Sequence, residues 1–442
     1  MNADLRPVRT KAELALVDTF TAARPNLPGG KAVAQLRTIA FERFAAEGLP
    51  HARVEAWKYT DLRRFMREAK PLAGKPEAAA KERARDAGAL LAGAGLRRVV
   101  IVDGKFAADL SDLADLDKGL SIQPMVDALV SDDLLRAQRL SPTMADDPML
   151  SLNTALAADG VVIEISPGAV LTRPIHLVFV TTGESAAAVY IKSQVVIGSG
   201  ARATVVETHE GPNGSDYQVN SALQLIVGDD AEVEHIKVTR EGDAALHVGT
   251  LVTSVGARAN FREFGFSVGG AVVRNQLFVR LAGEGTNAGI YGATLLAGRQ
   301  HADTTLLVDH LAPNSQSREI FKSVVDDEAC AVFQGKIAVR PGAQKTDAKM
   351  MARGLLLSDQ AEVDCKPELE IFADDVQCGH GSTTGALDDQ LKFYLMARGI
   401  PAKQAEALLI QAFVGEVVEA IAQDGVREAL LNAMTTWLAE RG

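Results

Sequence analysis

The chain has 442 residues, of which 47% are hydrophobic, and its formal net charge is −11 at pH 7. This length and composition supply ample apolar surface for a core and indicate one to three globular domains. The acidic balance, with an isoelectric point near 5.3, argues against a nucleic acid or an anionic membrane surface as a partner.

Cysteine usage and the start of the chain indicate a compartment. Cys330, Cys365 and Cys378 are an odd set without a Cys-x-x-Cys pair, which is typical of reduced thiols rather than of a disulfide framework. The N-terminus has neither the apolar segment of a signal peptide nor the acid-poor character of a transit peptide. Since no run of about 18 apolar residues is present, we expect a cytoplasmic protein without a membrane span.

The N-terminal part has a helical pattern. Over residues 8–70, apolar side chains recur every three or four positions, as they do on one face of a helix. Trp57 and Tyr59 follow these segments and are expected to anchor the helices in a core. Residues 70–95 are rich in alanine and contain prolines, which is typical of a linker. We therefore predict an N-terminal helical domain and linker over residues 1–92.

The central part is repetitive. Turns of small or acidic residues, each followed by an alanine, recur with spacings of 28 to 32 residues and one gap of 70; these alanines are Ala169, Ala201, Ala231, Ala259, Ala329 and Ala361. The gap leaves room for two more units, one of them near Gly283–Gly285. A period near 30 without an internal helix predicts a β-solenoid, in which stacked strands bury one face. The alternative is a large β-sandwich with regular turns. We place the β-solenoid core at residues 93–378.

The pattern becomes helical again near the C-terminus. After Gly381 the apolar residues recur at helical spacing, with a break at residues 397–401 and a strongly apolar stretch over residues 405–421. We predict a C-terminal helical domain over residues 379–442. Its helices are expected to pack on one another as a cap for the solenoid, although one apolar face could also dock a partner.

Cys378 and His380 are candidate metal ligands. Cys365, in the alternating stretch that precedes them, shares the apolar face of its strand and is expected to be a core residue. If the chain stays extended to Gly381, Cys378 and His380 point the same way, about 6.5–7 Å apart. A thiolate beside an imidazole suits zinc, iron or an iron–sulfur cluster. Two ligands cannot close such a site, so the others must come from elsewhere; taken alone, a Cys-x-His pair is more often structural.

Motifs typical of enzymes fail in their context. Residues 265–269 match the Gly-x-Ser-x-Gly nucleophile elbow, but the sequence that follows is strand-like where a helix is required. The Gly-Lys pairs lack the first glycine of a phosphate-binding loop, so we expect no nucleotide to be bound by this chain. Six histidines occur singly in strand-like sequence and are expected to be structural rather than ligands: His176, His209, His235, His247, His301 and His310.

Several segments together resemble the SufB/SufD family of iron–sulfur cluster assembly scaffolds. They are Trp57-Lys58-Tyr59-Thr60-Asp61, Ser317-Arg318-Glu319, Phe333-Gln334-Gly335-Lys336, the stretch 340–347, the stretch 366–371, and Cys378-Gly379-His380-Gly381. The SufB branch typically carries a Glu-His-Glu-like segment at the last of these positions, so the resemblance is closer to the SufD branch. It implies a mainly β fold, a right-handed parallel β-helix flanked by helical domains.

The resemblance also implies a function. The chain would be a non-enzymatic scaffold subunit that pairs with a SufB-like subunit and binds a SufC-like ATPase through its C-terminal helices. A transient iron–sulfur cluster or iron would sit at the subunit interface, with His380 as the main ligand and Cys378 as an auxiliary one. The alternatives are a SufB-like paralogue, a homodimeric scaffold and, less favoured, a carbohydrate-active enzyme built on a β-helix.

Overall fold

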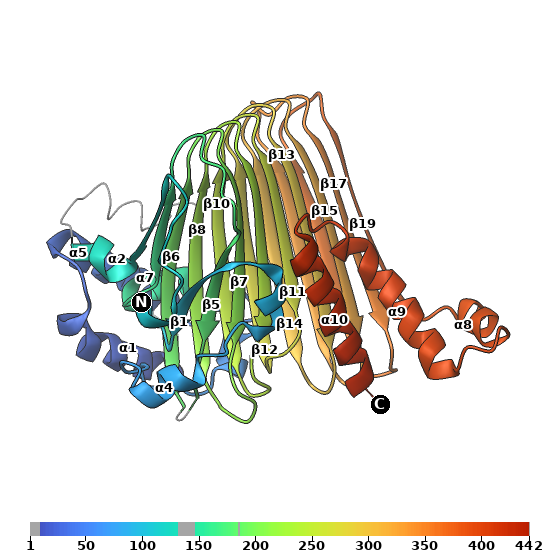
Figure 1. The fold of residues 1–442 in the computed structure, drawn as a ribbon, viewed down its shortest axis with the longest axis horizontal. Coiled ribbons are helices and arrows are strands. Elements are labelled where there is room, and N and C mark those ends of the chain that lie inside the picture. The colour runs from blue at the N-terminus through green and yellow to red at the C-terminus, as the bar shows by residue number, and fades with distance from the viewer. Residues whose placement is uncertain (1–8, 131–145, 184–185, 442) are drawn as a thin grey trace, which may run out of the picture.

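The computed structural model describes residues 9–130, 146–183 and 186–441, so the first eight residues of the predicted N-terminal domain lie outside it. Most of the described chain is a parallel β-solenoid of about eight turns, with helices at both chain ends (Figure 1). The predicted β-helix class is confirmed. The β-sandwich alternative is excluded, because neighbouring strands of successive turns run parallel.

Each full turn of the solenoid contributes one strand to each of two sheets. In the described residues, sheet A has the order β18-β16-β14-β12-β10-β8-β6-β4-β3 and sheet B the order β19-β17-β15-β13-β11-β9-β7-β5-β1-β2. The strands of sheet A are β3 (Leu120–Pro124), β4 (Val161–Ile165), β6 (Ala188–Ile197), β8 (Gln218–Val227), β10 (Leu246–Val255), β12 (Val272–Leu281), β14 (His301–His310), β16 (Cys330–Val339) and β18 (Glu362–Ile371). The strands of sheet B are β1 (Arg97–Val102), β2 (Lys105–Phe106), β5 (Ile175–Val180), β7 (Arg202–Glu210), β9 (Glu232–Arg240), β11 (Asn260–Ser267), β13 (Asn287–Leu296), β15 (Gln316–Val325), β17 (Asp347–Leu356) and β19 (Gln377–Ala386).

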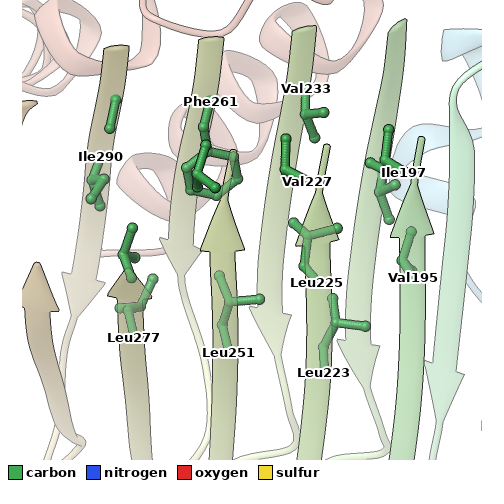
Figure 2. Packing of buried hydrophobic residues seen from close by; sticks show 14 of the residues in the cluster. Val195, Ile197, Leu223, Leu225, Val227, Val233, Leu251, Phe261, Leu277 and Ile290 are labelled. Atoms are coloured by element: carbon green, nitrogen blue, oxygen red, sulfur yellow. The ribbon is translucent and has the colours of Figure 1, made fainter. Parts of the chain in front are cut away.

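The space between the two sheets, here called the lumen, holds the main core. Alternate side chains of each strand point into it and stack on the equivalent side chains of the next turn. Leu223, Leu251 and Leu277 occupy matching positions on β8, β10 and β12, and Figure 2 shows them in the same cluster as Val227 and Phe261. Burying each such side chain stabilises the fold by about 1.5–3 kcal/mol. Stability therefore grows with the number of stacked turns.

The turns between the sheets explain the repeat of about 30 residues and show that the recurring alanines belong to both sides of the solenoid. Residues in the left-handed region stand at equivalent turn positions before successive strands of sheet B, among them Asp230, Arg258 and Asn314. Each donates its backbone N–H to the next turn, as Asp230 does to Ala257 O at 2.8 Å. The 70-residue gap does hold two more units, with turns before β13 and β15, and one of them falls at Gly283–Gly285 as predicted. It also holds half a turn more, because Ala259 precedes a strand of sheet B whereas Ala329 precedes one of sheet A.

The helical segments over residues 11–65 and 148–156 cover the outer face of sheet A, whereas the helices over residues 78–94 pack against sheet B. The core cluster on sheet A includes side chains of β6, β10 and β12 that point away from the lumen, such as Tyr190 and Val248. A capping box starts the first helix, since Glu13 N donates to Thr10 Oγ1 at 3.2 Å and Thr10 N to Glu13 Oε2 at 2.6 Å. The helices are α1 (Lys11–Ala23), η1 (Arg24–Asn26), α2 (Lys31–Glu47), η2 (Glu55–Trp57), α3 (Leu62–Phe65), α4 (Ala78–Arg83), η3 (Ala89–Ala94), η4 (Ala108–Leu110), α5 (Met125–Val130) and α7 (Pro148–Leu156).

Of the two aromatic residues predicted to be anchors, only Trp57 is one. Trp57 is buried, and its indole Nε1 donates to Asp147 Oδ2 at 3.1 Å. Tyr59 is only half-buried. The guanidinium of Arg274, on β12, lies 3.8 Å from the centre of the Trp57 ring. This stacking fixes the N-terminal segment to sheet A from outside.

The C-terminal helices lie on the outer face of sheet B and not over the end of the solenoid. They are α8 (Asp389–Met396), α9 (Ala402–Val418) and α10 (Asp424–Glu440). Residues of α9 and α10 such as Ile410 and Leu430 share a core cluster with Phe264 and Leu295 of sheet B. Figure 1 shows α9 and α10 beside the sheet and α8 projecting beyond it. The prediction that these helices cap the solenoid is therefore wrong.

The strand before these helices is longer than the sequence indicated. The prediction that helical structure begins after Gly381 is wrong, because β19 continues to Ala386, in register with β17 up to Leu356. The proposed domain boundary between residues 378 and 379 thus falls inside a strand. None of the helices in the described ranges is long and apolar enough to cross a membrane.

Candidate metal centre at the open end of the solenoid

The last turn of the solenoid, formed by β18 and β19, has no further turn stacked on it. In the described chain β18 pairs only with β16 and β19 only with β17, and neither strand has a fully buried residue. Ile371 and Phe372, at the end of β18, are 42% and 56% exposed. This end, here called the open end, therefore presents unpaired backbone groups together with apolar side chains, a combination that invites pairing with another chain.

Cys378 and His380 lie together on β19 and face the lumen. Their partners in register on β17 are Ala348 and Met350, which both belong to the main core cluster. The side chains of the last turn occupy the same inward positions but have nothing stacked above them. Cys378 is consequently half-buried and His380 exposed. The predicted pair thus shares one face of one strand, at the mouth of the lumen.

The electrostatics differ between the two candidate ligands. Burial raises the pKa of the Cys378 thiol above its usual value, so this thiol stays protonated at neutral pH unless a metal ion displaces the proton. Imidazole is the commonest side-chain ligand of metal ions, and the ring of His380 is exposed. His380 is therefore the readier ligand, and Cys378 would join once an ion is in place.

The described residues do not complete this site. Groups of three possible ligands close enough for one metal ion occur elsewhere in the described chain, and neither group includes Cys378 or His380. One of them, Cys330 with Glu362 and Asp364, involves the first residues of β16 and β18. Cys365 packs against the main core from the opposite sheet in the last turn, as its sequence position predicted. A metal held by Cys378 and His380 would need further ligands from another molecule.

Glu319 adds a buried carboxyl to the same inward column, a feature that the sequence interpretation missed. It lies in register with Met350, whose next partner is His380. Glu319 is fully buried, and burial raises the pKa of its carboxyl to about 8. Its negative charge, when present, also raises the pKa of Cys378. The alternation of side chains predicts this inward position, because Glu319 has the same strand parity as Phe321, a core residue.

The titration of Glu319 should make stability depend on pH. In the folded chain Glu319 keeps its proton up to about pH 8, whereas the unfolded carboxyl loses it near the ordinary value of 4.5. The folded state binds more protons between these values, so this stabilisation is complete below pH 4.5 and is lost as the pH rises to about 8. Glu319→Gln should remove the decline, so that wild type loses stability relative to the variant across this window. Urea unfolding of both proteins over the range measures it; parallel profiles would contradict the assignment.

A second exposed feature is the apolar face of α8. Leu391, Phe393, Tyr394 and Met396 are all more than two-fifths exposed, with Phe393 at 71%. In the described chain no residue of this helix is fully buried, and it packs on α9 rather than on a sheet. An exposed cluster of aromatic and aliphatic side chains is typical of a protein–protein contact.

Two family models match nearly the whole chain. Residues 11–177 match the N-terminal region of SufBD proteins, and residues 179–413 match the SufBD core domain of the SUF system for FeS cluster assembly. The second match contains the open end with Cys378 and His380, and also α8.

Individual proteins show the same similarity. An iron–sulfur cluster assembly SufBD family protein of Synechocystis is 32% identical over 387 residues, which cover 84% of each chain. The iron–sulfur cluster assembly protein SufD of Escherichia coli is 31% identical over 388 residues, which cover 87% of this chain and 88% of that one. The SufD protein of Bacillus subtilis is 27% identical over 292 residues, which cover 65% and 66%.

Proposed function

This chain belongs to the SufBD family of iron–sulfur cluster assembly proteins, and we propose that it serves in the cytoplasm as a non-enzymatic scaffold subunit. It pairs through its open end with a SufB-like subunit and binds a SufC-like ATPase through its C-terminal helices. A nascent iron–sulfur cluster, as cargo rather than resident cofactor, is held between the two scaffold subunits by His380, with help from Cys378.

The observation that carries this proposal is the open end itself. An edge of two strands with exposed Ile371 and Phe372 needs a cover, and a second solenoid offers matching strands. Pairing would bring that partner's ligands to the mouth of the lumen, where Cys378 and His380 supply too few. A site split between two chains holds a cluster less firmly than four cysteines of one chain, which suits a scaffold that must release its product.

A homodimer is the second candidate, because the same open end could pair with its own copy around a two-fold axis. Size-exclusion chromatography with light scattering separates the two. We expect the chain to form a larger complex when it is mixed with a SufB-like subunit and a SufC-like ATPase. We also expect the ATPase to bind the chain through α8 when no SufB-like subunit is present. A chain that stays unchanged in the presence of both would overturn the proposal.

Truncating the exposed face of α8 should release the ATPase. Phe393→Ser removes a large aromatic side chain that is 71% exposed, and anchor residues of this kind contribute about 2 kcal/mol or more to binding. We expect at least about a 30-fold weaker complex with the ATPase, measured by calorimetry, with no change in thermal stability.

Leu14→Ser is the matched control for this variant. Leu14 is a similarly exposed apolar residue, at 52%, on the distant helix α1. Equal weakening by both variants, or none by Phe393→Ser, would show that α8 does not hold the ATPase.

A further inference from the structure

The lumen is not apolar throughout. Midway along the solenoid, ionisable side chains replace apolar ones at inward positions of β7, β9, β10 and β11 and in the turn before β10. Each is at most 4% exposed, and they are Glu207, His209, His235, Glu241, His247 and Glu263. Buried groups of this kind cost stability unless they are paired or bind an ion. The arrangement of these six side chains therefore indicates whether they pair with one another or bind an ion.

Three of them converge on one point. A ligand atom from each of His209, Glu241 and His247 lies within 4.8 Å of the other two. The two imidazole rings meet edge to face, with centroids 4.8 Å apart, and His247 Nδ1 lies 2.8 Å from Glu241 Oε1. The three side chains come from both sheets and from the turn that joins them. Two imidazoles and one carboxylate are the donor set that binds Fe²⁺ and Zn²⁺ in proteins.

His209 has the surroundings of a metal-bound imidazole. Its Nε2 lies 3.0 Å from Glu207 Oε2, while its Nδ1, although buried, has no hydrogen-bond partner among the described residues. A carboxylate on one ring nitrogen orients the other toward a metal ion. Glu241 is held in place as well, because the hydroxyl of Tyr217 donates to its Oε2 at 2.7 Å.

The groups around these residues include more acidic than basic side chains. Three carboxylates, those of Glu207, Glu241 and Glu263, face two basic groups. His235 lies between Glu207 and Glu263; burial opposes its charge, but these carboxylates raise its pKa to about 10. Lys237 is the second basic group; its Nζ lies 3.2 Å from His247 Nε2, and burial lowers its pKa. The three carboxylates thus outnumber the basic groups, and a cation would offset the excess of negative charge.

A metal ion at this point would take the place of the proton between His247 Nδ1 and Glu241 Oε1, which lie 2.8 Å apart. That proton would leave to solvent, so metal uptake should release a proton.

A surface groove borders the turn that carries Glu241. The groove, of about 1260 Å³, lies beside α10 and is lined in part by Glu241, whose side chain is itself 1% exposed. A second cavity, of about 30 Å³, is lined by Lys237, Glu263 and Asn275 and has room for a water molecule. Entry of an ion from the groove would require the turn that carries Glu241 to move.

We propose that His209, Glu241 and His247 form a binding site for a divalent first-row transition-metal ion inside the lumen. The site is separate from Cys378 and His380, and it does not depend on a partner subunit. A purely structural hydrogen-bonded cluster is the competing account, and it predicts no stoichiometric metal uptake.

Metal uptake by the full chain decides between the two accounts. The variant Cys378→Ser/His380→Ala, which removes the open-end ligands, is stripped with chelator and dialysed against Zn²⁺. We expect one equivalent to be retained, and Co²⁺ bound in its place should show the visible absorption of a nitrogen- and oxygen-ligated ion. On this background, His209→Phe, which keeps the stacking of the ring on Phe179, should weaken binding by at least about 100-fold.

Two further variants make the result interpretable. Glu241→Gln preserves the hydrogen bond from Tyr217 and should also lose the metal. It replaces His209→Phe as the test if that variant does not fold. His176→Gln replaces another buried histidine, whose ring bonds to Thr208 at 2.9 Å and to no other side chain in the described part of the chain, and should leave uptake unchanged. Absence of uptake by the starting chain, or uptake that persists in folded His209→Phe and Glu241→Gln, would overturn the proposal.

Discussion

His380→Ala should abolish cluster formation in the assembled complex while leaving the chain folded and bound to its partners. His380 is exposed at the mouth of the lumen, so its removal leaves no cavity and no unpaired buried group. Loss of even a residue that supports a ligand costs 10–100-fold in metal affinity, and loss of a direct ligand should cost at least about as much. Anaerobic reconstitution, followed by iron and sulfide content per complex, measures the effect.

The contrast with neighbouring variants makes this test specific. Cys378→Ser should give a smaller loss, because the pKa of that thiol is raised and His380 is the readier ligand. Gln377→Ala changes an exposed residue of the same strand whose parity points it away from the lumen, and it should have no effect. Cluster yield unchanged in His380→Ala, or lost equally in Gln377→Ala, would show that His380 is not a ligand.

Arg274→Met should be among the most destabilising single substitutions outside the lumen. The Arg274–Asp303 ion pair is fully buried, Arg274 Nη2 donates to Ala56 O at 2.6 Å, and the guanidinium stacks on Trp57. Removing one partner of a buried pair leaves the other charge uncompensated and costs about 3–5 kcal/mol. Urea unfolding should show this loss, and proteolysis should show that the N-terminal helices detach first.

Two comparison variants test the cause. Arg274→Met/Asp303→Leu removes both charges and should recover much of the lost stability, since an apolar pair of similar volume can replace a buried ion pair. Arg202→Met breaks an exposed pair with Glu232 and should barely shift the unfolding midpoint. If Arg274→Met behaved like Arg202→Met, the buried pair would not be what fixes the N-terminal segment to sheet A.

The solenoid could be predicted because its rules are local. Alternation of side chains encodes which face of a strand is buried, and a turn with a left-handed residue recurs before each strand of sheet B from β7 to β17. Residues such as Asp230 and Asn314 meet this need. The sequence pattern did not separate the turns of the two sides, because a small buried residue such as Ala259 or Ala329 suits both.

What could not be predicted depends on contacts distant in the chain. The end of β19 has no apolar pattern, and residues 382–386 become a strand through their backbone pairing with β17. Likewise, the apolar stripe of α9 shows that it is buried but not against what. It contacts the outer face of sheet B, which leaves the open end uncovered, and this arrangement gives Cys378 and His380 their accessibility.

The lumen cluster could have been predicted from register between turns. Spacing within each strand gives only isolated histidines, among them His209, His235 and His247. Each has the strand parity of core residues, so charged or imidazole side chains at inward positions of neighbouring turns had to meet. Register between turns, rather than spacing within a strand, is what brings such residues together in a solenoid.

Hydrogen exchange of the backbone amides, measured on the chain alone and in complex with a SufB-like subunit, tests most directly whether the open end is the pairing surface. We expect slower exchange in β18 and β19 on complex formation, with the opposite end of the solenoid, at β1 and β3, unchanged. Protection at β1 and β3, with β18 and β19 exchanging as fast as in the free chain, would contradict the account.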